Sequence, residues 1–344
     1  MNLFRNFCRG IAISILLIVA TSELRAGGRE LINLIPESRV VIDFPDPGNV
    51  IGGAPWMLII YALPNGNTIE HTAGRKIKPG DDWHYDIQHI SAQTEFIRHY
   101  SKRYNYVVAY LESGTRAWTS YAAKHQDSPE LFVSLVDTLI SITRKEISGA
   151  VKGRDLSIAL CSHSGGGRFV FNYIAGSVAR YGLIPKPVRI ILFIDSNYGF
   201  EDSLHTKPLV NWLRQPGERR LTVISYIDST VVLNGKHIVS STGGTGYRSM
   251  LMKESLEREG FHFSSHIDTT FKRYRSYAPL KGARGSSIEI LIKENPNGNI
   301  YHTVLVEKNG FIESIIPRSR APFVFWGDRA YSGFINDKFE ISPF

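Results

Sequence analysis

The stretch that most constrains the fold is residues 155–167, DLSIALCSHSGGG. Its first half is an almost unbroken apolar run, which is typical of a strand buried on both faces of a sheet. Residues 168–181, RFVFNYIAGSVARY, follow directly, and apolar side chains recur there at helical spacing. The sequence therefore predicts a buried strand, a sharp glycine-rich turn and a helix, with Ser164 at the tip of the turn.

This order of elements is the setting of a G-x-S-x-G nucleophile elbow. The turn needs small side chains two positions before and two positions after the serine, and these positions hold Ser162 and Gly166. Ser162 departs from the usual glycine but is small enough to fit. Gly165 follows the serine at the start of the helix, where we expect its N–H to point toward a developing oxyanion.

Two other interpretations of the turn remain open. A glycine-rich turn between a strand and a helix can also bind phosphate, although the P-loop lysine and the dinucleotide-binding glycine spacing are both absent here. The turn could also be purely structural. A nucleophile further requires a base and an acid at neighbouring strand ends.

Apolar runs and amphipathic segments alternate along the whole chain, which predicts an α/β fold with a mainly parallel, doubly wound sheet. The expected strands are residues 38–45, 56–63, 104–111, 156–160, 188–194, 221–226 and 287–292. The expected helices are residues 81–97, 131–147, 168–181, 207–214 and 247–260. Residues 112–129 are expected to form a long polar loop, residues 261–284 show no clear pattern, and the C-terminal segment is expected to dock as an aromatic tail.

The partners of a nucleophilic serine are sought at the carboxyl ends of the other strands, where active groups lie in such sheets. Serine must lose its proton to a base as it attacks, and the base needs an acid to orient it. Asp195, Asp228 and His302 all follow predicted strands. His302 follows the last clear strand and a turn, although a packed structural histidine is an alternative. The other histidines after the elbow are His205, His237, His262 and His266.

On these residues, the region 56–302 resembles the α/β-hydrolase superfamily, in which the triad follows the chain order serine, acid, histidine. The resemblance implies that Ser164 attacks, that His302 is the base, and that the acid usually follows the second strand after the elbow. That position favours Asp228, whereas some lipases place the acid one strand earlier, which would select Asp195.

The resemblance also implies a second oxyanion N–H from the loop after strand 56–63. This loop reads PNGNT, so the N–H would come from Asn65 or Gly66. A plain surface turn has the same composition and is the alternative.

No metal or organic cofactor is expected. His84 and His89 with Asp86 could suggest a metal site, but their spacing is not H-E-x-x-H and no cysteine accompanies them, so capping and packing is the favoured interpretation. Cys161 is expected to be a small buried hydrophobic residue rather than a nucleophile.

The N-terminus predicts a signal peptide. Arg5 and Arg9 precede the apolar run 11–20, which is short for a membrane span, and small residues follow at 26–28. We expect residues 1–26 to be removed and residues 27–344 to form a single domain in the periplasm or outside the cell. Cleavage after Ala20, or an uncleaved anchor that touches the membrane, are the alternatives.

The expected function is therefore that of an extracytoplasmic serine hydrolase acting on an ester or amide of a small molecule or a polymer. The formal net charge of +8 is not gathered into a basic block, which argues against a nucleic-acid partner. The aromatic residues Trp118, Tyr121, Trp326 and Tyr331 could stack on sugar rings, which suggests a carbohydrate or envelope polymer, although packing of loops is the alternative. A non-catalytic binding protein on the same scaffold remains the alternative function, and the sequence predicts no oligomeric state.

Overall fold

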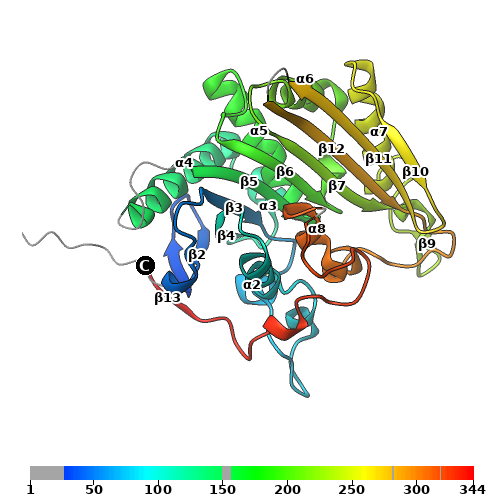
Figure 1. Cartoon of the computed structure of the whole chain (residues 1–344). Helices are drawn as coiled ribbons and strands as arrows, with labels where there is room; N and C mark the ends of the chain where they lie inside the picture. Colours follow the sequence, from blue (N-terminus) through cyan, green and yellow to red (C-terminus); the bar gives the residue numbers. More distant parts are fainter. Residues whose placement is uncertain (1–26, 149–155, 281–282, 318) are drawn as a thin grey trace, which may run out of the picture.

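The computed structural model describes residues 27–148, 156–280, 283–317 and 319–344 (Figure 1). The expected signal segment, residues 1–26, lies outside these ranges. Within them, eleven strands form one sheet in the order β10-β11-β12-β7-β6-β5-β3-β4-β2-β1-β13. In Figure 1 the sheet runs from the blue strands on the left to the yellow and orange strands on the right.

The middle of the sheet is parallel. Its strands are β4 (Asn105–Ser113), β3 (Trp56–Ala62), β5 (Leu156–His163), β6 (Val188–Ile194), β7 (Arg220–Tyr226) and β12 (Ala283–Lys293), each paired in parallel with its neighbour. All seven residues of β3 are buried, which explains its continuous apolar run. The predicted α/β class and the mainly parallel sheet are confirmed by this strand order.

Both edges of the sheet carry antiparallel strands. On one side, β2 (Ser38–Phe44) pairs with β4 and with β1 (Gly27–Ile32) in antiparallel fashion, and β13 (Ile341–Pro343) then pairs with β1 in parallel. On the other side, β11 (Phe271–Leu280) joins β12 to β10 (Ser264–Ile267). These last two strands occupy the region 261–284 that showed no clear pattern in the sequence.

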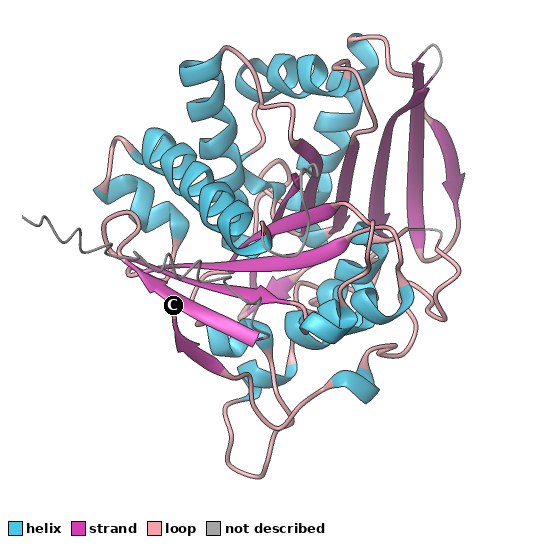
Figure 2. Ribbon diagram, turned by 60° about the vertical axis from the view of Figure 1, so that its left-hand side comes forward, coloured by secondary structure: helices cyan, strands magenta, loops and turns pink. Residues whose placement is uncertain are grey.

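Helices cover both faces of the sheet, as Figure 2 shows. One face carries α3 (Trp118–Lys124), α4 (Ser128–Ile147), α5 (Gly167–Tyr181), α6 (Asp202–Leu213) and α7 (Thr245–Arg258), and the other carries α1 (Ile69–Ala73), α2 (Ile90–Tyr100) and α8 (Phe311–Ile315). Along β3, Leu58 and Ile60 face the first core, whereas Met57 and Ile59 face the second. This alternation is the period of two that a strand imposes, so β3 supplies both cores.

The C-terminal segment docks as an aromatic tail, as predicted. Tyr331 is fully buried, and Phe323 and Phe334 both pack edge-on against Phe96 of α2. Among the described residues, no helix combines the length and the apolar character needed to cross a membrane.

The expected polar loop 112–129 instead contains α3, and this corrects the idea of an aromatic sugar platform. Trp118 and Tyr121 of α3 are fully buried in the core, where their rings pack against Phe132. Tyr331 is buried as well, whereas Trp326 is half-buried and packs edge-on against Tyr301. The rings of Trp118, Tyr121 and Tyr331 therefore have no free face to stack on a sugar.

Candidate active site

The Ser164 turn has the strained geometry of an elbow. β5 ends at His163, and Ser164 then takes a left-handed conformation with φ of 53° before the single turn η3 (Ser164–Gly166) leads into α5. A serine in this region costs about 1 kcal/mol or more and persists only where its surroundings enforce it. The turn thus lifts Ser164 out of the sheet at the carboxyl end of β5.

The three glycines after Ser164 enforce this geometry because the neighbouring chain approaches them closely. A Cβ on Gly165 would lie 1.9 Å from Asn65 Oδ1, and one on Gly166 would lie 2.2 Å from the carbonyl oxygen of Ala62. A Cβ on Gly167 would lie 1.6 Å from a backbone oxygen of the loop after β6. The start of α5 is therefore pressed against the ends of β3 and β6, where only glycine fits.

Ser162 replaces the usual glycine because it finds hydrogen-bond partners. Its side chain is fully buried, and its Oγ lies 2.8 Å from Ser196 Oγ. Ser196 Oγ in turn donates to the Ser162 carbonyl at 3.2 Å. A buried hydroxyl is tolerated when it is bonded in this way, so the departure from the motif leaves the elbow intact.

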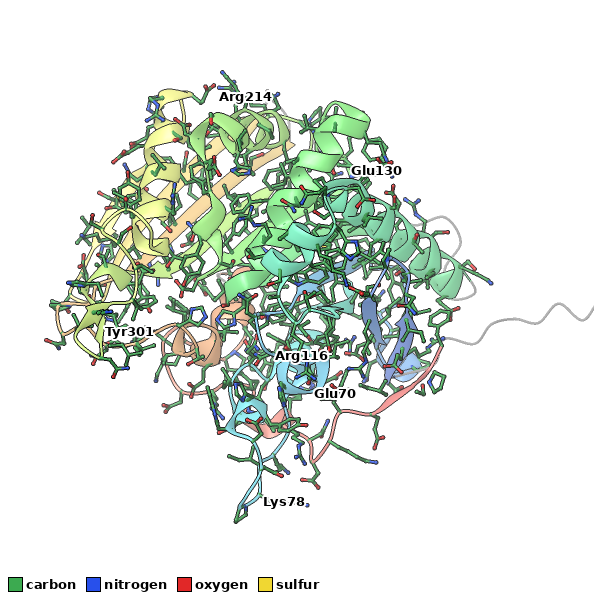
Figure 3. All side chains as sticks on the ribbon, turned by 180° about the vertical axis from the view of Figure 1, so that it is seen from behind. Glu70, Lys78, Arg116, Glu130, Arg214 and Tyr301 are labelled. Carbon is green, nitrogen blue, oxygen red and sulfur yellow. The ribbon has the colours of Figure 1, made fainter. Side chains whose placement is uncertain are left out.

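His302 lies after β12, on the segment marked by its neighbour Tyr301 in Figure 3. Its Nδ1 is hydrogen-bonded to Asp195 Oδ2. Burial by itself would lower the pKa of His302, but the hydrogen bond to Asp195 and the negative charges of Asp195 and Asp228 outweigh it and raise the pKa above its usual value. The ring is thus oriented through Nδ1, which leaves Nε2 as the nitrogen able to accept a proton.

Asp195 is fully buried directly after β6, and its φ of 44° turns the chain there. Besides the His302 ring, its carboxylate accepts a hydrogen bond from the Thr245 hydroxyl and another, at 3.3 Å, from the Tyr198 hydroxyl. Thr245 and Tyr198 thus hold the Asp195 carboxylate in place, and the carboxylate in turn fixes the position of the His302 ring through its Nδ1 atom.

Asp228 does not contact the His302 ring, which corrects the preference that the sequence suggested. Its carboxylate instead accepts the Thr245 N–H at 2.8 Å, at the start of α7. Burial, followed by the charge of Asp195, raises the pKa of Asp228. The physical reason is the path of the chain after β7, which folds back so that the first turn of α7 binds the Asp228 carboxylate.

The second oxyanion N–H also differs in part from the expectation. The Gly66 N–H donates to the carbonyl of Arg116, labelled in Figure 3, at 2.8 Å and is therefore not free. Within the described residues no hydrogen bond engages the Asn65 N–H, and Gly165 lies in the first turn after the elbow, where an N–H has no partner inside the helix. Asn65 and Gly165 are the pair that remains available.

Ser164 and His302 line the same cavity, which has a volume of about 510 Å³. No hydrogen bond joins Ser164 Oγ to the His302 ring among the described contacts, a separation that is common in catalytic sites without substrate. The cavity is lined by Asn65, Thr119, Ser164, Gly165, Arg168, Ser196, Tyr198, Gly199, Tyr226, Ile238, Val239, Ile300 and His302.

His163, directly before Ser164, does not line this cavity. Its Nε2 lies 3.0 Å from the His302 carbonyl oxygen, and its Nδ1 lies 3.3 Å from Gln88 Oε1. Burial, and then the charge of His302, lower the pKa of His163 to about 3. A neutral His163 therefore donates to the main chain of His302 and supports it. No pattern in the sequence indicates this contact, or those of Thr245 and Tyr198.

The other late histidines do not line the cavity. Burial lowers the pKa of His205 to about 4, and its Nδ1 accepts the Glu201 N–H at 2.9 Å. His237, His262 and His266 are exposed. Of the candidate bases, the structure brings His302 alone to Ser164.

The histidines near residue 84 have structural partners. His89 Nε2 lies 2.8 Å from Asp86 Oδ1, and Arg329 also donates to that oxygen at 2.6 Å. A separate group of His71, Asp82 and His84 places its ligand atoms within 4.8 Å of one another, but Asp82 already accepts the His84 N–H at 2.9 Å. None of these residues lines the cavity at Ser164.

Comparison with known proteins finds no matching family model and no matching curated protein. Among solved structures, the chain is similar to LpqC, a poly(3-hydroxybutyrate) depolymerase from Bordetella parapertussis, with 10% identity, a TM-score of 0.44, and coverage of 85% of this chain and 93% of that one. It is also similar to the siderophore hydrolase EstB from Aspergillus nidulans, with 10% identity, a TM-score of 0.43, and coverage of 85% and 96%. An acetyl xylan esterase from Aspergillus awamori gives 9% identity, a TM-score of 0.40, and coverage of 78% and 93%.

With TM-scores below 0.5 and about a tenth of residues identical, these matches carry no argument about the chemistry of this chain. Its own geometry is more informative. A strained serine, Ser164, lies between a parallel strand and a helix. Ser164, Asp195 and His302 follow one another in the chain order that is typical of α/β-hydrolases. The strand order and this geometry together have the arrangement of an α/β-hydrolase fold.

Proposed function

We propose that the chain is a serine hydrolase that cleaves an ester or amide through Ser164, His302 and Asp195. The observation that carries the proposal is the cavity that Ser164 and His302 both line. The Nδ1 atom of His302 is hydrogen-bonded to the buried Asp195, so its Nε2 atom is left to accept the serine proton. A strained serine, a histidine and a buried carboxylate in this arrangement have the roles of nucleophile, base and orienting acid.

In the proposed reaction, Ser164 Oγ attacks the substrate carbonyl carbon while its proton passes to His302 Nε2. The carbonyl oxygen becomes an oxyanion, which the N–H groups of Gly165 and Asn65 stabilise. The intermediate then collapses, the bond to the leaving group breaks, and the leaving alcohol or amine takes the proton from His302. Water, deprotonated by His302, attacks the acyl-enzyme and releases the carboxylic acid and free Ser164.

The raised pKa of His302 fits this role because the positive ring formed during attack is stabilised by the Asp195 carboxylate. A base with a pKa near the working pH accepts the serine proton and returns it to the leaving group. Asp195 also fixes the tautomer, since its hydrogen bond keeps the proton on Nδ1.

Turnover of 4-nitrophenyl acetate and of a peptide 4-nitroanilide tests the proposal and separates esterase from amidase activity. We expect a burst of nitrophenol equal to the enzyme concentration if deacylation is slow, and loss of at least about 10³-fold in kcat for Ser164→Ala and His302→Ala. Equal rates for the wild type and both variants would overturn it.

The alternative is a non-catalytic binding protein on the same scaffold, in which Ser164 and His302 would stay apart, as they do among the described residues, even with a ligand bound. Such a protein would hydrolyse neither substrate and would not react with a fluorophosphonate. The proposed enzyme would hydrolyse at least one of the two substrates and would react with the fluorophosphonate.

An extracytoplasmic location is proposed from the pattern of residues 5–28 alone, where basic residues precede a short apolar run and small residues follow it. The mass of the mature chain tests it. A chain that begins at or near Gly27 supports removal of a signal, whereas a chain that retains residues 1–26 would contradict that removal and favour the uncleaved anchor.

A further inference from the structure

Arg168 is the charged side chain closest in sequence to Ser164 on the helical side of the elbow, and it lines the cavity. It lies in the first turn of α5, four residues after Ser164, so about 6 Å of helix rise separates the two backbones. Its side chain is exposed, and no hydrogen bond or ion pair engages its guanidinium within the described part of the chain. The group is therefore free to bind a ligand.

The remaining lining of the cavity leaves this charge uncompensated. Of the described residues, no carboxylate lines the cavity, and apart from His302 the other lining side chains are neutral hydroxyl, amide and apolar groups or glycine. Asp195, which is hydrogen-bonded to the His302 ring, is fully buried and is not part of the lining. A cleft lined by one sign of charge attracts ligands of the opposite sign.

Two other arginines of the described chain show how such a group is held when it has acidic partners. The Arg98 guanidinium donates to Asp43 and Glu95, and the Arg329 guanidinium donates to Asp86 and Glu307. Among the residues that the structure describes, Arg168 has no such partner.

We propose that Arg168 forms an anion-binding subsite, which selects substrates that carry a carboxylate close to the scissile ester or amide bond. This inference rests on the proposed hydrolase function and names its substrate class. The planar guanidinium presents paired N–H groups that match the two oxygens of a carboxylate. Because Arg168 and Ser164 belong to one elbow and one helix, a carboxylate held by Arg168 would place the scissile carbonyl at a fixed distance from Ser164 Oγ.

The test compares kcat/KM for matched pairs of charged and neutral substrates. The 4-nitrophenyl esters of adipic acid and of adipic acid monoamide differ by one charge on the acyl side. The butyrate esters of 4-hydroxybenzoate and of 4-hydroxybenzamide differ by one charge on the leaving-group side. Arg168→Gln removes the guanidinium charge, Arg168→Lys keeps the charge but not the paired geometry, and Arg144→Gln, at an exposed position of α4 away from the cavity, controls for the change in net charge.

We expect the wild type to prefer the charged member of at least one pair by about tenfold, because a charge-assisted hydrogen bond is stronger than a neutral one. Arg168→Gln should remove this preference while the neutral rates stay within about threefold, Arg168→Lys should retain part of it, and Arg144→Gln should leave it unchanged. Added salt should weaken the preference. The pair that responds identifies which side of the scissile bond Arg168 contacts.

Two results would overturn the inference. One is an equal rate for the charged and neutral members of both pairs in the wild type. The other is a preference that Arg168→Gln leaves intact or that Arg144→Gln removes equally. Calorimetric binding of adipate and adipamide to Ser164→Ala gives the same comparison without turnover. If adipate binds and its binding depends on Arg168, but the wild type hydrolyses none of the ester or amide substrates, the hydrolase function is refuted while the anion-binding subsite is supported.

Discussion

Replacement of Asp195 by asparagine tests the proposed orientation of the His302 ring most sharply. The carboxylate accepts hydrogen bonds from the His302 ring, the Thr245 hydroxyl and the Tyr198 hydroxyl. An amide has one accepting oxygen and one donating NH₂ group, so it cannot serve the donors on both carboxylate oxygens. If its NH₂ faces His302, the ring must carry its proton on Nε2 and cannot take the proton of Ser164.

The expected cost follows from that tautomer. In a Ser-His-Asp triad the same substitution lowers kcat by about 10⁴, which corresponds to about 5.5 kcal/mol in the activation free energy. The matched control is Asp228→Asn, because Asp228 is an equally buried carboxylate after the next strand, and its asparagine oxygen could still accept the Thr245 N–H. We expect that variant to keep kcat/KM for 4-nitrophenyl acetate within about tenfold of the wild type.

Both variants should be assayed across pH, with circular dichroism melts to establish that each is folded. A loss of about 10⁴ in Asp195→Asn beside a small loss in Asp228→Asn supports Asp195 as the acid that orients His302. A larger loss in Asp228→Asn, with both proteins folded, would refute that role and assign it to Asp228.

Three further outcomes are expected. Because attack needs a neutral His302 and its pKa is raised, kcat/KM should fall as the pH drops through a pKa above 6.5; a limb below 6 in the pH–rate profile would contradict this. Gly167→Ala places a Cβ 1.6 Å from the Ser196 carbonyl oxygen and should lower the free energy of unfolding, measured in urea, by about 2 kcal/mol or more. Gly199→Ala is the control, because its Cβ would lie 3.4 Å from its nearest neighbour and should cost far less. Equal unfolding free energies for the two variants would contradict the close approach at Gly167. Burial raises the pKa of the Cys161 thiol, so iodoacetamide should label it only after unfolding, and rapid labelling of the folded protein would contradict its placement.

Much of the fold could be predicted because the parallel strands are buried on both faces. That burial requires continuous apolar runs, which are visible in the sequence at residues 56–62 and 188–194. The elbow could be predicted for a related reason. The glycines that follow Ser164 are needed because Asn65 and Ala62 approach this turn closely, so the run of glycines is visible in the sequence. His302 could be predicted from its place after the last buried strand.

The choice between the two acids could not be predicted, because Asp195 and Asp228 both follow parallel strands and both end up buried in one network. Thr245 separates their roles: its hydroxyl donates to Asp195 and its N–H donates to Asp228. That depends on how residues 228–244 return to the start of α7, and the Gly/Ser/Thr-rich sequence of the later part of this loop carries no periodic signal. The sequence could not show that the Gly66 N–H is engaged, for a similar reason. Its partner is the backbone carbonyl of Arg116, and a contact between two backbone groups leaves no signal in the side chains.

The strands at the far edge were missed because their residues are polar and cationic. All four residues of β10 are exposed, and β11 alternates buried side chains such as Tyr274 with half-buried cationic ones such as Arg275. The Arg275 side chain donates to Glu289 of β12 at 2.7 Å, so pairing across strands stabilises what hydrophobic periodicity alone does not indicate.

Whether Ser164 is a nucleophile activated by His302 can be measured by reaction of the folded protein with a fluorophosphonate, followed by intact mass and peptide mapping. We expect one adduct per chain, on Ser164, with labelling lost in Ser164→Ala and slowed by orders of magnitude in His302→Ala and Asp195→Asn. No adduct on the folded wild type, or an adduct on another residue that forms just as fast in those variants, would contradict it.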